Sequence, residues 1–128
     1  MKKVLFVCVE NSCRSQMAEA YARMLGEGKV EAYSSGSAPS GRVNEKAIAS
    51  LAEVGYDLSQ HRSKPLDEIP QIEYDIAITL GCGDECPSVR AKFREDWKIP
   101  DPKYLEREQF NEVRDQIQDR VRALIANL

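Results

Sequence analysis

Residues 4–15 read VLFVCVENSCRS and are the most informative segment of the chain. Residues 4–9 form a continuous apolar run rich in β-branched side chains, which is typical of a strand buried on both faces of a parallel sheet. Polar residues then interrupt the run, and from Ser15 the apolar positions recur at helical spacing as far as Gly26. The stretch therefore predicts a strand, a short loop and a helix.

The rest of the chain repeats this alternation. Residues 30–35 and 74–80 are further strand candidates, and residues 93–97 are a fourth, shorter one. Asn44 can cap a second helix, which Gly55 would end. A long C-terminal helix is indicated by one apolar stripe, made of Phe110, Val113, Ile117, Val121, Leu124 and Leu128.

Strands that alternate with helices favour an α/β fold, and we expect a three-layer sandwich with a four-stranded parallel sheet and helices on both faces. The 128 residues suit one domain, over residues 1–128, with a real core. The net charge of −3 argues against nucleic-acid and membrane partners, and no apolar run reaches the length of a membrane span. We expect a cytosolic monomer with reduced thiols, so the four cysteines are explained by reactivity, metal or chance and not by structural disulfides.

Cys8, Arg14 and Ser15 form a Cys-x5-Arg-Ser pattern between the first strand and the first helix. Backbone N–H groups of such a turn, with the positive end of the helix dipole, make a nest for a tetrahedral oxyanion. Arg14 adds a planar charged fork that can bind two oxygens at once. This environment stabilises a thiolate at Cys8, to which Ser15 can donate its hydroxyl. The pattern predicts Cys8 as a nucleophile facing a bound oxyanion. The oxyanion would be held by the anion loop, which consists of Val9, Glu10, Asn11, Ser12, Cys13 and Arg14.

Two more thiols, Cys82 and Cys86, follow the third strand candidate. Because adjacent parallel strands end at the same edge, Cys82 can lie near Cys8, and the thiols can then pass a disulfide from Cys8–Cys82 to Cys82–Cys86. A phosphatase needs only one nucleophilic thiol, so the extra pair indicates electron transfer. The alternative is a zinc site of Cys8, Cys13, Cys82 and Cys86, which Arg14 would oppose.

Three further residues need an interpretation. Asp101 lies between two prolines that fix its backbone, and near the anion loop it could protonate an oxygen leaving the substrate; otherwise it belongs to an ordinary turn. Cys13 either packs or forms a protective disulfide with Cys8. His61, the only histidine, is expected to be structural or on the surface.

Several of these segments together resemble a known family. The segments are Cys8-x5-Arg14-Ser15, Ser34-Ser35-Gly36, Gly81-Cys82…Cys86-Pro87 and Asp96-Trp97…Asp101-Pro102, with the stretch NSCRSQMAE over residues 11–19. They resemble the thioredoxin-coupled arsenate reductases, which share the low-molecular-weight protein tyrosine phosphatase fold. The similarity runs almost from end to end.

The resemblance implies a mechanism with three thiols. Cys8 attacks arsenate while Asp101 protonates the departing oxygen. Cys82 then attacks the Cys8 sulfur and releases arsenite. Cys86 captures Cys82, and thioredoxin reduces the Cys82–Cys86 disulfide, so no bound cofactor is expected.

Two features of the family leave points open. Some relatives use glutathione and glutaredoxin, which need no third thiol; Cys86 favours thioredoxin. Several members bind potassium with an Asn, a Glu, a Ser and an Asp, and here Asn11, Glu19 and Ser34 match while Lys64 replaces the Asp. We expect the Lys64 ammonium to take the place of potassium; otherwise Lys64 is simply solvated.

Two other functions remain as alternatives. A phosphotyrosine phosphatase would use Cys8, Arg14 and Asp101 and leave Cys82 and Cys86 idle. A sensor of oxyanions or of redox state, acting through a partner, would have no turnover.

Overall fold

A computed structural model describes residues 1–81 and 89–128 of the chain. In these residues a four-stranded parallel sheet has the order β2-β1-β3-β4. In chain order the elements are β1 (Lys2–Cys8), α1 (Arg14–Leu25), β2 (Val30–Gly36), α2 (Glu45–Ala52), η1 (Leu58–Gln60), η2 (Leu66–Glu68), β3 (Tyr74–Leu80), β4 (Ala91–Trp97) and α3 (Arg107–Ala126). The α/β class and the four-stranded parallel sheet are confirmed.

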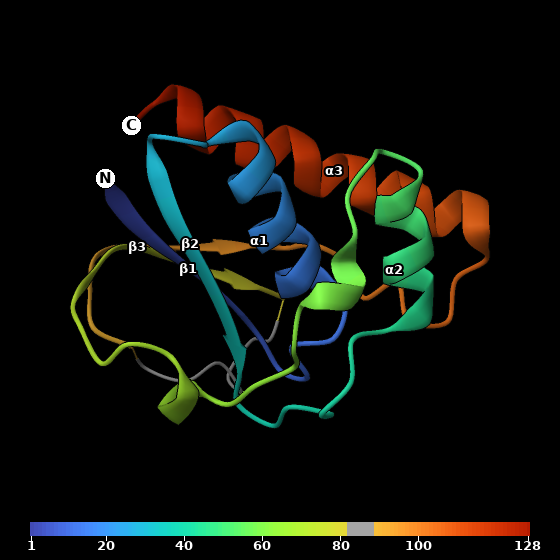
Figure 1. Cartoon of the computed structure of the whole chain (residues 1–128), viewed down its shortest axis with the longest axis horizontal. Helices are drawn as coiled ribbons and strands as arrows, with labels where there is room; N and C mark the ends of the chain where they lie inside the picture. The colour runs from blue at the N-terminus through green and yellow to red at the C-terminus, as the bar shows by residue number, and fades with distance from the viewer. Residues whose placement is uncertain (82–88) are drawn as a thin grey trace.

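Strand β1 lies in the interior of the sheet and is buried on both faces. Its partner strands are β2 on one side and β3 on the other. Phe6 packs on one face with the three α-helices, which Figure 1 shows together above the sheet. Leu5 and Val7 pack on the opposite face, where η2 and the residues after it provide the cover. The apolar run is therefore continuous for the expected reason: its alternate side chains enter two different hydrophobic cores.

The helix ends match the predicted ones only in part, since α2 ends at Ala52 and not at Gly55. The first helix begins at Arg14, one residue before its expected start, and Gly26 follows its last residue as predicted. Gly26 has a φ of −110°, so its role is not a left-handed cap. A Cβ at this position would lie 2.5 Å from Val30 Cγ2, which shows that close packing requires the glycine. Asn44 caps α2 as expected, since its side chain accepts a hydrogen bond from the Lys46 backbone N–H.

The C-terminal helix differs from its predicted stripe at one end. Ile125 is buried, whereas Leu128 lies beyond the helix and is 41% exposed, so the inclusion of Leu128 was wrong. The chain leaves helical geometry at Asn127, which turns the last side chain away from the core. None of the helices in the described ranges is long and apolar enough to cross a membrane.

Candidate active site

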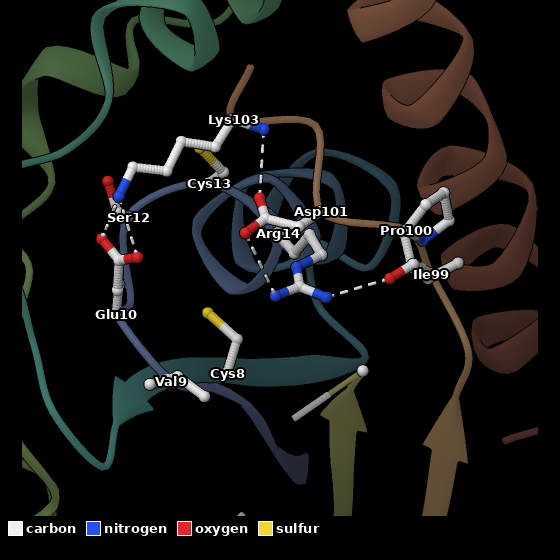
Figure 2. Close-up of a pocket in the computed structure, with 11 residues that line it drawn as sticks. Cys8, Val9, Glu10, Ser12, Cys13, Arg14, Ile99, Pro100, Asp101 and Lys103 are labelled. Carbon is white, nitrogen blue, oxygen red and sulfur yellow. Dashed lines mark hydrogen bonds and ion pairs between the residues drawn. The ribbon is translucent and has the colours of Figure 1, made fainter. Parts of the chain in front are cut away.

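The site lies at the carboxyl edge of the sheet, where ligands bind in parallel α/β folds. A cavity of about 460 Å³ opens there between the β1–α1 loop and the segment that follows β4. Its lining residues are Cys8, Val9, Glu10, Ser12, Cys13, Arg14, Gly81, Ile99, Pro100, Asp101 and Lys103. The structure therefore brings the predicted nucleophile, arginine and acid into one cavity (Figure 2).

Cys8 ends β1 and is almost fully buried, with its sulfur pointing into the hollow in Figure 2. Its Sγ lies 2.8 Å from Ser15 Oγ. Asn11 Nδ2 donates a hydrogen bond to the same Ser15 oxygen, also at 2.8 Å. Because Ser15 already accepts from Asn11, its own hydroxyl proton is free to point at the sulfur and to stabilise a thiolate. Ser15 thus lies within hydrogen-bond distance of the predicted nucleophile, where a donor was expected.

Asn11 has a structural role that its place in the anion loop did not reveal. It is fully buried, and its φ of 49° puts the backbone in the left-handed region that Asn tolerates better than most residues. Its Oδ1 accepts hydrogen bonds from the Lys64 backbone N–H at 2.9 Å and from Gln16 Nε2 at 3.0 Å. Unlike its neighbours in the loop, Asn11 is not among the cavity-lining residues, and its side chain holds the loop from behind.

Gln16 was missed by the sequence analysis. It is fully buried in the first turn of α1, and its amide N–H groups also bond to the carbonyl oxygens of Asn11 and Arg62. A long polar side chain at a buried helical position is the signal that could have identified it, because such a group needs partners.

Arg14 is oriented by the segment after β4. Its Nη1 donates to the Ile99 carbonyl oxygen at 3.0 Å, and its Nη2 lies 3.9 Å from Asp101 Oδ2. Gly81 makes room for the guanidinium, since a Cβ there would lie 2.5 Å from Arg14 Nη1. The φ of Gly81 is +73°, which also favours glycine.

Asp101 lies at the rim of the cavity and is about half exposed. Its Oδ1 accepts a hydrogen bond from the Lys103 backbone N–H at 3.0 Å, which fixes the carboxyl group in the turn between the two prolines. A carboxyl group on this rim is in a position to exchange a proton with a ligand oxygen and with water.

Cys13 differs from Cys8 in its surroundings. It is buried and reduced, and burial raises its pKa to about 12, with further contributions from Asp101 and Cys8. At neutral pH it is therefore a protonated thiol, which is a poor nucleophile. The other predicted thiols, Cys82 and Cys86, lie outside the described residues; they are also two of the four ligands of the alternative zinc site.

A second polar cluster lies behind the anion loop around the buried carboxylate of Glu19. Ser34 Oγ donates to Glu19 Oε1, and the Lys64 ammonium lies 3.4 Å from Ser34 Oγ and 3.9 Å from Glu19 Oε1. Arg23 pairs with the other carboxylate oxygen. Lys64 is thus not simply solvated, since its side chain is only 16% exposed.

The residue His61 is partly buried, and its side chain is only 4% exposed. Its Nδ1 bonds to Gln16 Oε1 at 2.9 Å, and its Nε2 bonds to the Tyr56 hydroxyl. Because the amide oxygen can only accept, Nδ1 carries the proton and Nε2 accepts from Tyr56. Burial lowers the pKa of His61, so the ring is neutral at pH 7.

Comparison with known proteins gives consistent results. Residues 3–128 match the family described as low molecular weight phosphotyrosine protein phosphatase. The chain is 46% identical to the glutaredoxin arsenate reductase of Synechocystis sp., over 100% of this chain and 99% of that protein. It superposes on the solved structure of an arsenate reductase in the phosphate binding state with a TM-score of 0.90 and 45% identity, over 99% and 98% of the two chains. A thioredoxin-dependent arsenate reductase from Corynebacterium glutamicum gives a TM-score of 0.79 and 31% identity, over 99% of this chain and 61% of that one.

Proposed function

The chain belongs to the low molecular weight phosphotyrosine protein phosphatase family, and we propose that within this family it is an arsenate reductase with a relay of three thiols. Its identity to arsenate reductases over nearly the whole chain supports the substrate. The observation that carries the relay is the position of Gly81, which lines the same cavity as Cys8 and directly precedes Cys82 in the sequence.

The first step uses the residues of the cavity. Arg14 and the amides of the β1–α1 loop hold the arsenate oxygens, and the Cys8 thiolate attacks arsenic. An oxygen leaves as water after it receives a proton from Asp101. Ser15 lowers the cost of the free thiolate by donating its hydroxyl to Cys8. The product is a covalent bond between Cys8 sulfur and arsenic, with arsenic still in its oxidised state.

The next two steps move electrons between sulfur atoms. The Cys82 thiolate attacks the Cys8 sulfur, the sulfur–arsenic bond breaks, and its electron pair leaves with arsenic as arsenite. This forms the Cys8–Cys82 disulfide. Cys86 then attacks Cys82, which forms the Cys82–Cys86 disulfide and returns Cys8 as a thiolate. One external dithiol is needed to reduce that disulfide before the next turnover.

We propose thioredoxin as the external dithiol, acting in the cytosol, where thiols are kept reduced. The names of the similar proteins include both glutaredoxin and thioredoxin coupling. Cys86 supports thioredoxin, since a third thiol gives a disulfide within this chain that a dithiol partner can reduce by exchange.

We expect arsenate to drive NADPH oxidation when the protein is mixed with thioredoxin and thioredoxin reductase. Glutathione, glutaredoxin and glutathione reductase should support a rate at least about tenfold lower, because their route leaves Cys86 unused. Omission of arsenate is the control in each system. A faster rate with glutaredoxin would contradict the choice of donor but not the reduction of arsenate, whereas no rate with either donor would contradict the function.

We propose that the residues that match a potassium site do not bind the ion in this chain. Asn11 Oδ1, the side-chain amide oxygen, already accepts from two N–H donors, and the Lys64 ammonium lies beside Ser34 and Glu19. Burial lowers the pKa of Lys64, while the carboxylate of Glu19 acts in the opposite direction. We propose that this ammonium supplies the positive charge next to Glu19.

Arsenate turnover should therefore be the same in potassium chloride as in sodium chloride of equal ionic strength. The initial rate is measured in the coupled assay over a titration of each salt, with choline chloride as the reference. A gain in rate specific to potassium would show that the ion binds in spite of Lys64.

A further inference from the structure

Glu10 of the anion loop carries a negative charge beside the expected position of a bound anion. Glu10 lies between Cys8 and Arg14, and its side chain lines the cavity in which an oxyanion would bind. A carboxylate beside a bound anion repels it, and the repulsion persists where water is partly excluded. Anion binding therefore requires a positive group that offsets the charge of Glu10.

Lys103 supplies that group from a distant part of the chain. Its Nζ lies 3.0 Å from Glu10 Oε2 and 3.1 Å from Glu10 Oε1, so it contacts both carboxylate oxygens. Figure 2 shows its side chain extending from the segment of Asp101 across to the anion loop. Hydrogen bonding to Glu10 raises the pKa of Lys103, which keeps the ammonium charged.

The Lys103–Glu10 ion pair strongly affects the net charge around the described part of the cavity. Among the lining residues, Arg14 and Lys103 are the cations and Glu10 and Asp101 are the carboxyl groups. Without the Lys103 ammonium, one arginine would face two carboxyl groups in a cavity meant for an anion. The bond from the Lys103 backbone to Asp101 does not depend on the side chain, so the ammonium can be removed while this bond is kept.

We propose that Lys103 determines the affinity of the cavity for oxyanions by neutralising the Glu10 carboxylate. The inference rests on the oxyanion cavity of the proposed function but not on the thiol relay. It can therefore be tested by binding alone, with inorganic phosphate as an unreactive tetrahedral anion.

The experiment compares dissociation constants for phosphate by isothermal titration calorimetry at low ionic strength. Lys103→Met should weaken binding about three- to tenfold, and high salt should shrink the difference because the charges are partly exposed. Adding Glu10→Gln to Lys103→Met should restore the wild-type constant to within about twofold, since the uncompensated charge is then removed. Arg107→Met is the matched control: it breaks the exposed Arg107–Glu53 pair, which is outside this cavity, and should leave the constant unchanged.

The double variant, Glu10→Gln with Lys103→Met, distinguishes neutralisation of Glu10 from a merely structural role of Lys103. If Lys103 only tied the two segments together, loss of the Glu10 charge would not restore binding to Lys103→Met. Equal binding by wild type and Lys103→Met, or a double variant as weak as Lys103→Met, would overturn the inference alone. Absence of phosphate binding by the wild type would overturn both the inference and the oxyanion cavity of the proposed function.

Discussion

Replacing Cys8 by serine is expected to reduce arsenate turnover by about 10⁴-fold or more, which is the usual scale for loss of a nucleophile. The Cys8 sulfur is the group at the base of the cavity that receives the Ser15 hydroxyl, and a serine hydroxyl in its place stays protonated at neutral pH. The coupled assay measures the turnover. Phosphate binding should persist in the variant, because Arg14 and the loop amides remain.

Cys13→Ser is the matched control for this prediction. The substitution is the same, the residue belongs to the same loop, and its thiol is protonated because its pKa is raised to about 12. Turnover should stay within about tenfold of the wild type. An equal loss in both variants would show that serine damages the loop, and retention of turnover by Cys8→Ser would contradict the assignment of the nucleophile.

Replacing Cys82 by serine should have the second-largest effect, and a selective one. Without Cys82 the sulfur–arsenic bond of the first step has no attacking thiol, so repeated arsenate turnover should fall about 10³-fold or more. Hydrolysis of an aryl phosphate should stay at its wild-type rate, because it requires Cys8, Arg14 and Asp101 only. Both reactions are measured on the same preparation.

The outcome separates the reductase from the phosphatase. Unchanged arsenate turnover in Cys82→Ser would rule out the relay and favour a phosphatase in which the extra thiols are idle. Cys86→Ser provides an internal check. In this variant the relay should stop one step later, and the Cys8–Cys82 disulfide should accumulate.

The fold could be predicted from the sequence because its signals are local. The run over residues 4–9 and the helical spacing after Ser15 each act through neighbours in the chain, and both elements formed within two residues of their expected bounds. Gly26 was predicted to follow the helix, but the reason, contact with Val30, depends on packing. Leu128 was wrongly included because the predicted stripe ran to residue 128, whereas the helix ends at Ala126.

The site was predicted only in part, and the missing part is made of long-range contacts. The anion loop and Asp101 carry recognisable patterns. The partners of Asn11 and Glu10 do not, because Lys64 lies 53 positions from Asn11 and Lys103 lies 93 positions from Glu10. The effect of a charged loop residue such as Glu10 on anion binding cannot be predicted until its distant partner is known.

The proposed relay requires that this one chain reduce arsenate with its own thiols. The direct measurement is a single turnover, in which the fully reduced protein is mixed with excess arsenate and no electron donor. Released arsenite is counted, and the disulfides are mapped by mass spectrometry after acid quenching. The proposed relay predicts one arsenite per chain and a Cys82–Cys86 disulfide, with Cys8 again free. Release of no arsenite, or a full equivalent released while Cys82 and Cys86 both remain reduced, would contradict it.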